Sequence, residues 1–308
     1  PMQRRLVALG GGLTACLLGG LLALSGAVFS PVAAGPKAVE LTRYVWSDLP
    51  EGMGGLSGIE LSDDGTRFAV ISDAGWITTG LVRRKQGQIT TWRAKPFVPL
   101  RAPSGLTQGS ARLDAEGLAL RADGTLAISY EVIPRVFTYD TVLSPRAHAL
   151  PDNPHLPRFT GNRGLEALAE DPQGCLVAIL EQAEGGGYPV YRLCQKGRTP
   201  GRWNLVARLA KAGRFVPVGA DYGPDGWLYL LERHFTGVGF RSRIRRLDLS
   251  RPDMGAQTLM TSAVWAYDNL EGLSVWADRH GNLRLTAVSD DNFLSVQVTQ
   301  IVEFAVQD

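Results

Sequence analysis

The sequence predicts an all-β protein, a β-propeller of five four-stranded blades. Three observations lead to this fold class. A hairpin pattern occurs five times along the 308-residue chain, the repeats begin at intervals of 50 to 59 residues, and the residues that remain at the two ends together make up one more interval. No stretch after residue 35 has the apolar stripe and the end signals of an amphipathic helix, so a helical fold is not expected.

Each repeat is expected to be a β-hairpin. A small residue begins a short apolar run, a tight turn follows about seven positions later, and a second apolar run ends in an acid. The turns are mostly Asp-Gly, a pair that favours two-residue hairpin turns. The repeats begin at Gly58, Gly117, Ala167, Gly219 and Gly272.

Repeats of this length are typical of a radial propeller, because each one has room for two further strands such as residues 135–139 and 244–249. We expect residues 39–46 to form an outer strand beside residues 301–306, so that the N-terminal strand completes the last blade. Five blades are predicted, or six if the long interval between 58 and 117 contains a degenerate blade.

The first 34 residues are interpreted as an export signal. Two arginines precede an uncharged stretch over residues 6–29, and residues 32–34 are small, as a signal peptidase requires. Cleavage after Ala34 is expected to leave a single propeller domain over residues 35–308, in the periplasm or outside the cell. The arginine pair does not distinguish the Sec from the Tat export route.

Two alternatives to cleavage stay open, an uncleaved membrane anchor and lipidation at Cys16. Removal of the signal would leave 30 basic and 30 acidic residues, since the whole chain has 32 and 30. A balanced charge gives no electrostatic footprint for nucleic acid or for an anionic membrane. Neither partner is expected once the signal has been removed.

The two remaining cysteines, Cys175 and Cys194, are expected to form a disulfide, since an exported protein folds in an oxidising compartment. They begin and end the predicted strands 175–181 and 188–194, which share one midpoint, so the two thiols would face each other across a hairpin. The alternative is a pair of buried free thiols.

Acidic residues are expected to meet at one end of the inner strands. In an antiparallel hairpin, the start of the first strand lies beside the end of the second. Reflection about the turns places acids opposite each other in three blades, Glu116 with Glu131, Glu166 with Glu181, and Glu271 with Asp290. The other two blades add Asp73 and Glu232.

A bound cation is the simplest compensation for so many acids, because facing like charges destabilise a sheet and clustered carboxylates cannot all ionise. Oxygen ligands favour calcium first and magnesium second. Zinc is not expected, since the four histidines show no paired spacing. The alternative is structural, with each acid capping backbone NH groups or pairing with arginines such as Arg163 and Arg233.

The sequence resembles the phytase-like family of exported bacterial proteins, which are described as having esterase-like activity. The resemblance covers nearly all of residues 40–306, and it implies a β-propeller with a link to calcium-dependent phosphate-ester hydrolysis. The chain departs from the pattern at Ser57 and Val218, which stand where other blades have an acid before the small residue. Five motifs carry the resemblance: Asp114-Ala115-Glu116-Gly117-Leu118, Arg163-Gly164-Leu165-Glu166-Ala167, Leu230-Leu231-Glu232-Arg233, Asn269-Leu270-Glu271-Gly272-Leu273 and Ser289-Asp290-Asp291-Asn292-Phe293.

These residues suggest a hydrolytic site. A carboxylate such as Glu131 or Glu181 would take a proton from the attacking water, and Arg233, assisted by Arg163, would hold the oxyanion. His234 is the candidate acid for the leaving group, although a packed or solvated histidine is the simpler interpretation. The expected calcium ligands are Glu116, Glu166 and Glu271, with Glu232, Asp290 and Asp291 as further candidates.

Two function classes follow from the sequence. One is a calcium-dependent hydrolase of phosphate esters or other esters, acting on a small molecule. The other is a non-catalytic propeller whose rim binds a metal, a ligand or a partner protein, since propellers serve both uses. No Gly-x-Ser-x-Gly motif occurs, so an α/β-hydrolase type of covalent serine mechanism is not expected. The sequence predicts neither the natural substrate nor the oligomeric state.

Overall fold

A computed structural model describes residues 35–107, 113–156, 164–196, 199–251 and 254–307. The predicted export signal and Arg163 lie outside these residues. The described residues form twenty-one strands. Among them there is no helix of the length and apolarity that a membrane crossing needs.

The strands make five antiparallel sheets, which are the five blades. Blade one contains β2 (Leu56–Leu61), β3 (Arg67–Ser72), β4 (Trp76–Lys85) and β5 (Gln88–Ala94), with the short β6 (Val98–Pro99) beside β4. Blade two contains β7 (Ala115–Leu120), β8 (Leu126–Tyr130), β9 (Arg135–Tyr139) and β10 (His148–Ala149). Blade three contains β11 (Leu165–Glu170), β12 (Leu176–Leu180), β13 (Gly187–Lys196) and β14 (Thr199–Ala210). Blade four contains β15 (Val216–Tyr222), β16 (Leu228–Phe235), β17 (Phe240–Leu247) and β18 (Gln257–Thr261). Blade five contains β19 (Asn269–Ala277), β20 (Leu283–Asp290), β21 (Gln300–Gln307) and β1 (Lys37–Val45).

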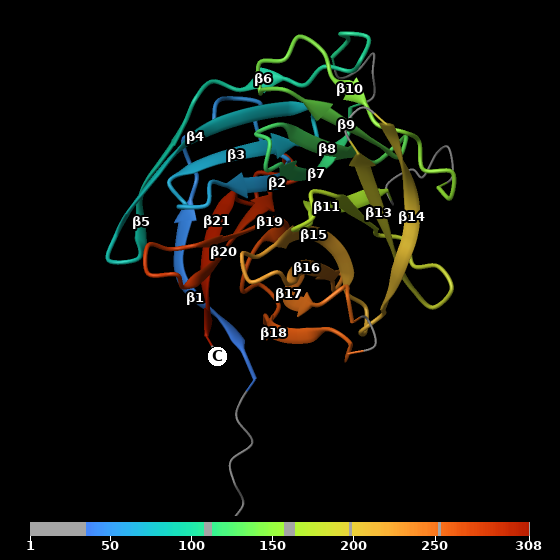
Figure 1. The fold of residues 1–308 in the computed structure, drawn as a ribbon. Coiled ribbons are helices and arrows are strands. Elements are labelled where there is room, and N and C mark those ends of the chain that lie inside the picture. The colour runs from blue at the N-terminus through green and yellow to red at the C-terminus, as the bar shows by residue number, and fades with distance from the viewer. Residues whose placement is uncertain (1–34, 108–112, 157–163, 197–198, 252–253, 308) are drawn as a thin grey trace, which may run out of the picture. The chain divides into compact units, whose positions relative to one another are not determined.

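The predicted fold class and blade number are confirmed. Figure 1 shows β2, β7, β11, β15 and β19 around the centre of the ring, with β14 and β18 on the outside. The N-terminal β1 pairs antiparallel with β21, for example Val39 with Ala305, so the two ends of the described domain complete one blade as expected. The long interval after residue 58 contains the extended β4–β5 hairpin and β6, and no sixth sheet forms among the described residues.

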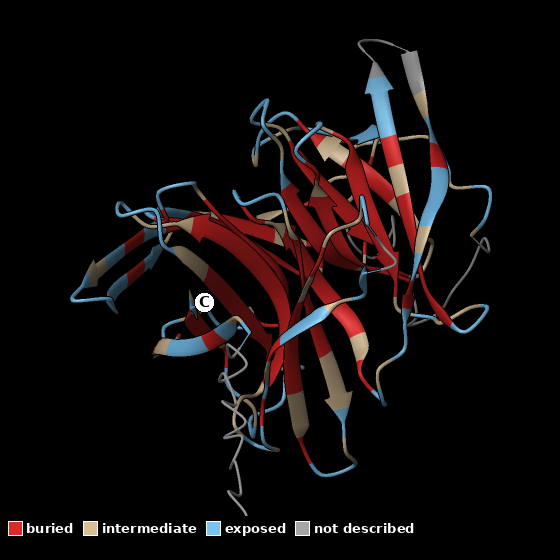
Figure 2. Ribbon diagram, turned by 60° about the horizontal axis from the view of Figure 1, so that its bottom comes forward, coloured by how far each residue is buried: buried red, intermediate tan, exposed pale blue. Residues whose placement is uncertain are grey.

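Most residues of the inner strands are buried, and the interior of the domain is largely red in Figure 2. All six residues of β2 and all five of β8 and β12 are buried. Neighbouring blades cover both faces of these strands, which is why their sequences are nearly continuous apolar runs instead of alternating ones. Side chains from adjacent blades form the core clusters, for example Ile71 of blade one with Ile128 of blade two. Packing on both faces therefore fixes the ends of the inner strands in space.

Every innermost strand contains a β-bulge near its start, and this feature shapes the site. The pairing register shifts between Leu56 and Gly58, and a corresponding shift occurs in β7, β11, β15 and β19. Bulges re-aim side chains and are common beside active sites. The residues at the five bulges are Ser57, Glu116, Glu166, Val218 and Glu271.

A small residue follows each bulge because neighbouring inner strands approach there backbone to backbone. A Cβ atom on Gly219 would lie 2.3 Å from the carbonyl oxygen of Glu271, and one on Gly272 would lie 2.9 Å from the backbone nitrogen of Ile59. The cavity that remains on the axis measures about 10 Å³, which is room for roughly one water molecule. The axis is therefore closed, and the two ends of the propeller are separate surfaces.

The bulges also correct the predicted pairing of acids. Direct opposition of Glu116 with Glu131, Glu166 with Glu181 and Glu271 with Asp290 is wrong by two residues in each blade. The backbone NH of Glu131 donates to Asp114 O at 3.0 Å, the NH of Glu181 donates to Gly164 O at 3.2 Å, and Asp290 pairs with Asn269. The extra residue in each first strand moves the glutamate out of the ladder.

The expected disulfide is present in the structure. Leu176 of β12 lies opposite Leu193 of β13, and the flanking Cys175 and Cys194 are bonded with their Cα atoms 4.4 Å apart. The bridge closes the β12–β13 hairpin, as the shared midpoint of the two strands predicted.

Reduction of this disulfide is expected to lower the free energy of unfolding by about 3 kcal/mol, because a short closed loop restricts the unfolded chain. The measurement is the midpoint of urea unfolding with and without reductant. The Cys175→Ser/Cys194→Ser double variant should unfold at the midpoint of the reduced protein and should not respond to reductant. Equal midpoints for the oxidised and reduced proteins would contradict the prediction.

Candidate metal centre

Carboxyl groups from four blades gather at the end of the propeller where the inner strands begin. Three come from the bulges, four follow the second strand of a blade or end it, and one precedes β7. Their charges influence one another across the blades. We call this group the acidic mouth, and its members are Asp73, Asp114, Glu116, Glu131, Glu166, Glu181, Glu271 and Asp290.

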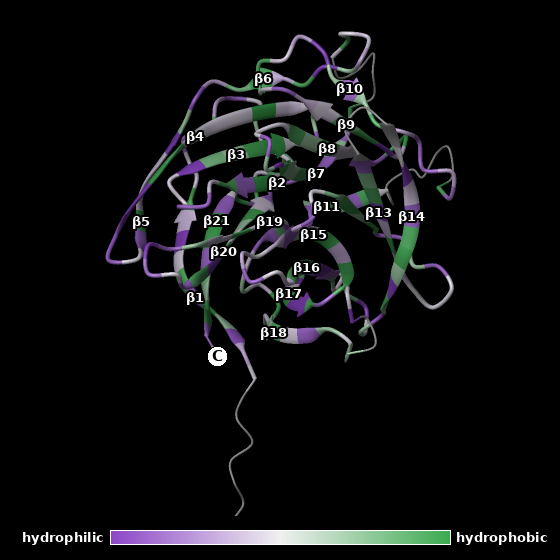
Figure 3. Cartoon of the chain, in the orientation of Figure 1, coloured by the Kyte–Doolittle hydropathy of each residue, from purple (hydrophilic) through white to green (hydrophobic). Residues whose placement is uncertain are grey.

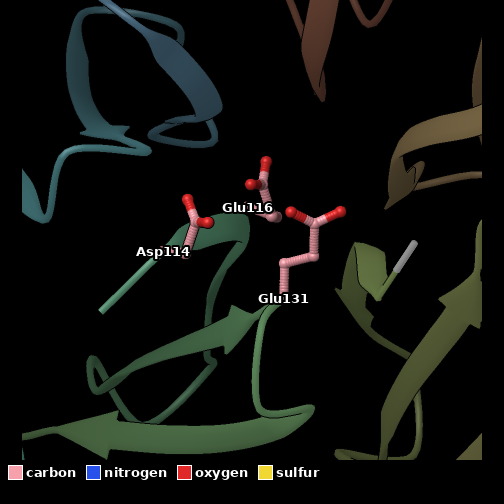
Figure 4. Close-up of side chains that lie close together, drawn as sticks. All are labelled: Asp114, Glu116 and Glu131. Atoms are coloured by element: carbon pink, nitrogen blue, oxygen red, sulfur yellow. The ribbon is translucent and has the colours of Figure 1, made fainter. Parts of the chain in front are cut away.

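Two sets of three carboxylates in the mouth have the spacing of metal ligands. The first set consists of Asp114, Glu116 and Glu131, which each have one carboxylate oxygen within 4.8 Å of the corresponding oxygens of the other two. Glu131, Glu166 and Glu181 form a second set with the same spacing. Figure 4 shows the first set, with the three side chains directed into one space. Two oxygens on opposite sides of a calcium ion are separated by roughly 4.8 Å, twice the metal–oxygen distance of about 2.4 Å. Glu131 belongs to both sets and therefore links them.

Glu166 gives a second, independent sign of a missing partner. The residue is only 6% exposed, and its Oε1 atom is buried without a hydrogen-bond partner. Its carboxyl group is also hydrogen bonded to that of Glu131, an arrangement that requires a proton on one of the two. A buried oxygen without a partner is costly, and a cation held by the set would satisfy it.

The pKa values of the mouth are raised. Burial, followed by the charges of neighbouring carboxylates, raises the pKa of Glu116 and of Glu166 well above the usual range. Burial, and then Asp290 and Asp114, raises the pKa of Asp73 to about 7. Burial, and then Glu271, raises the pKa of Asp290 to about 7. These groups therefore hold protons near neutral pH, and a bound cation would displace them.

Arg233 and Asn269 join three blades across the mouth. The guanidinium of Arg233 forms an ion pair with Glu271 of blade five and lies 3.5 Å from Glu181 of blade three. The Asn269 amide donates to Glu271 at 2.8 Å and to Asp290 at 3.2 Å, and its oxygen accepts from Arg233 at 3.2 Å. Burial alone would lower the pKa of Arg233, but Glu271 and the other nearby carboxylates raise it above its ordinary value. Glu271, a predicted metal ligand, is thus already paired with a cation.

Glu232 does not face the mouth, and its predicted role as a ligand is not supported. It is fully buried, and it accepts hydrogen bonds from Arg243 at 2.6 Å and from Arg245 at 2.8 Å. Both arginines belong to β17, whose hydrophilic colour stands out in Figure 3. Successive residues of a strand point to opposite faces, so Glu232 and Arg233 of β16 face different neighbours. The mirror symmetry of the hairpin predicted correctly at which end of the strand Glu232 lies. It did not predict the face of the sheet to which the side chain points.

His234 is on the same face of β16 as Glu232, two residues away. Its ring packs edge-on against Phe215, with the ring centroids 5.5 Å apart. This places it against the residue that precedes β15 instead of beside the carboxyl groups of the mouth. Its predicted role as the acid for the leaving group has no geometric support.

Glu232→Gln is expected to destabilise the protein by about 3 to 5 kcal/mol, because it leaves two buried arginines without their counter-charge. Calcium affinity should be unchanged, because the residue does not face the mouth. Chemical denaturation and calcium titration of the variant test the two statements separately. Loss of calcium binding with unchanged stability would restore Glu232 to the ligand set.

Asp291 has a structural role in the loop after β20. Its Oδ1 accepts from the backbone NH of Gly55 at 3.0 Å and of Phe293 at 3.1 Å, and its Oδ2 accepts from the Thr299 hydroxyl at 2.9 Å. The bond from Phe293 makes an Asx turn, the bond from Gly55 holds the loop against the segment before β2, and the bond from Thr299 holds it against the residue before β21. These contacts occupy both oxygens of a predicted ligand.

Asp114 and Asn269 are site residues that were not predicted from the sequence. Both were part of the quoted motifs, and each stands two residues before a bulge glutamate, Glu116 or Glu271. A recurring polar residue at that position was the signal available in the sequence. The bulge itself has no such marker, apart from the small residue that follows it.

Carboxyl groups at the other end of the inner strands have a different use. Glu60 of β2 accepts from the backbone NH of Leu120 at 3.3 Å and lies 3.1 Å from the Ser274 hydroxyl. Asp221 of β15 accepts from the NH of Val275 at 2.6 Å. Each of these bonds joins one blade to another. At this end, therefore, the acids have the structural role that was the alternative to metal binding. Burial raises the pKa of Glu60 as well, which makes it a useful control for the mouth.

Several solved structures are similar to this chain at low sequence identity. A regucalcin from Agrobacterium tumefaciens, described as calcium-binding, has a TM-score of 0.50 at 10% identity, over 87% of this chain and 96% of its own. A PQQ-bound aldose sugar dehydrogenase from Streptomyces coelicolor has a TM-score of 0.45 at 15% identity, over 86% of this chain and 98% of its own. A gluconolactonase from Xanthomonas campestris has a TM-score of 0.43 at 13% identity, over 81% and 72%. At these identities the likeness concerns the fold alone.

A search of curated proteins gives no match to the sequence. The phytase-like family, described as "Esterase-like activity of phytase", matches residues 51–293. That range contains all eight carboxyl groups of the mouth and the five bulges. The chain belongs to the phytase-like family.

Proposed function

We propose that the protein is a calcium-dependent hydrolase of phosphate esters or other small-molecule esters, with the acidic mouth as its active site. The observation that carries this proposal is the buried, unpartnered Oε1 of Glu166 inside a set of closely spaced carboxylates. Family membership supports an ester substrate. The regucalcin likeness does not decide the metal, so the calcium proposal rests on the donor atoms of this chain.

The donor set fits a hard cation. Asp114, Glu116 and Glu131 would hold a cation in one set, and Glu131, Glu166 and Glu181 would do so in the other. All of these ligands are carboxylate oxygens, which suit calcium or magnesium and not a metal that prefers sulfur or imidazole. When bound, such an ion polarises an ester or phosphoryl oxygen and makes a nearby water more acidic.

The remaining groups of the mouth would move protons and orient the substrate. Asp73 and Asp290, with pKa values of about 7, are suited to accept a proton from water at neutral pH. This task replaces the one predicted for Glu131 and Glu181, which belong to the ligand sets. Arg233 brings a permanent positive charge to the mouth and attracts an anionic substrate, while Asn269 holds Glu271 and Asp290 in place.

We also propose that the protein is exported. The disulfide between Cys175 and Cys194 supports this, because such bonds persist in oxidising compartments such as the periplasm.

Turnover of a chromogenic phosphate ester and of a carboxylic ester tests the hydrolase proposal. The chelator-treated protein is assayed with calcium, with magnesium and with neither. We expect turnover that appears with calcium and disappears with chelator. A protein that binds calcium, as judged by its melting temperature, but hydrolyses no ester would reject the hydrolase and favour the non-catalytic propeller.

A further inference from the structure

A pocket of about 360 Å³ opens beside the acidic mouth, between the loops of blades four and five. Its volume is within the range of small-molecule sites. Its walls carry large apolar side chains that solvent reaches, with Phe235 58% exposed, Val238 68%, Trp265 71% and Val296 87%. Apolar residues this exposed and this close together indicate a binding surface. We call it the apolar pocket.

The wall formed by Trp265 is held in a strained conformation. Trp265 has a φ angle of 67°, a backbone region that residues with side chains rarely adopt and that costs free energy. Its indole lies against Gly239, where a Cβ atom would be only 2.7 Å from the ring. The backbone NH of Trp265 donates to Phe240 O at 3.3 Å. The β16–β17 turn and the β18–β19 connection thus fit each other, and their fit sets the position of the indole.

The polar groups of the pocket bond to one another. Asp268 accepts from the Gln297 amide at 2.6 Å and from the backbone NH of Val298 at 2.8 Å. Arg43 is paired with Glu40 at 3.0 Å. These bonds satisfy the charged groups without a ligand, so the pocket is suited to a neutral, apolar group. An apolar cavity of about 150 Å³ accepts benzene, so the larger space here would hold a fused aromatic ring.

The apolar pocket lies next to the acidic mouth. Arg233 and Phe235 are two residues apart on β16, which places their side chains on the same face of the strand. In blade five, Asp268 lines the pocket, and the next residue, Asn269, accepts a hydrogen bond from Arg233. The path along β16 leads from the charged site to the aromatic wall.

We propose that the apolar pocket binds the non-reacting part of the substrate, an aryl group in preference to a sugar or another polyol, while the ester group lies in the acidic mouth. The inference rests on the proposed hydrolase function for the reacting end of the substrate. Binding of an aryl group in the pocket requires neither metal nor turnover, and it is testable by itself.

The binding test uses naphthol and the calcium-free full-length protein, measured by equilibrium dialysis. Trp265→Gly removes the indole. Because glycine tolerates a positive φ angle better than any other residue, the variant is expected to fold. Phe235→Ala removes the opposite wall. Both should weaken naphthol binding about tenfold or more. The control Leu205→Ala changes an exposed apolar residue on β14, away from the pocket, and should bind like the wild type.

The kinetic test compares naphthyl phosphate with phenyl phosphate in the presence of calcium, since their leaving groups have similar acidity. The wild type should have a higher kcat/KM for the naphthyl ester by about tenfold, and Trp265→Gly should bring the ratio close to one. If the wild type binds naphthol and the variants do not, but neither ester is hydrolysed, the result would support the pocket and would reject only the hydrolase proposal.

Equal naphthol binding by the wild type and both pocket variants would overturn the inference. A wild-type dimer that Trp265→Gly converts to monomers, with naphthol binding unchanged, would also overturn it, and would assign the pocket to a second copy of the chain.

Discussion

Glu131→Gln is expected to remove calcium binding and to lower ester turnover by on the order of 100-fold or more. Glu131 is the one carboxylate that belongs to both ligand sets, so its loss deprives each set of a charged oxygen. A glutamine keeps the size of the side chain and one oxygen, so the fold should persist. The measurements are calcium titration and kcat/KM with saturating calcium.

Glu60→Gln is the matched control for this variant. Glu60 is also a buried inner-strand carboxyl with a raised pKa, but it lies at the opposite end of the closed axis and bonds to Leu120 and Ser274. Its replacement should leave calcium affinity and turnover unchanged. Equal loss of calcium binding in both variants would mean that the effect is a general one of the fold, and equal retention would remove Glu131 from the site.

The metal-free protein is expected to lose stability as the pH rises from about 4 to about 7. The pKa of Asp290 is 3.8 in an ordinary environment and about 7 in the folded protein, so the folded state holds more protons than the unfolded state between these values. Stability is then fully present below the lower value and is lost as the pH rises through the upper one. For one such carboxyl the change is on the order of 4 kcal/mol. Asp73, Glu116 and Glu166 are shifted in the same direction.

Calcium should reverse this loss, because it binds the ionised form of the mouth. A concentration one hundred times the dissociation constant stabilises by about 2.7 kcal/mol. The measurement is the urea midpoint against pH, with chelator and with calcium. Asp290→Asn should flatten the chelator curve, while a control at the turn residue Asp64, whose hydrogen bonds lower its pKa to about 2, should affect only more acidic solutions. A metal-free protein that gains stability over this range would contradict the prediction.

The fold was predictable because its signals are local. Asp-Gly turns define the hairpins, and their even spacing gives the number of blades. The closure of the last blade followed from counting residues at the two ends, and β1 does pair with β21. The disulfide followed from the symmetry of one hairpin, and Cys175 is bonded to Cys194.

The site was predictable only as a gathering of acids. That acids such as Glu116 and Glu166 meet at one end follows from hairpin geometry, but their partners depend on a bulge that shifts each ladder by one residue. The face on which Glu232 lies depends on alternation along β16, and its partners Arg243 and Arg245 are on a neighbouring strand. Such tertiary pairings leave no simple pattern in the sequence.

If the mouth exchanges protons for a divalent cation, calorimetric titration of calcium into the metal-free protein near neutral pH should detect the exchange. The titration is made in two buffers with different heats of ionisation. Because the pKa values of Asp73 and Asp290 are about 7 and burial raises the pKa of Glu166 well above its usual range, we expect at least one bound ion per chain and a net release of protons. Absence of binding, or binding heat that is the same in both buffers, would contradict it.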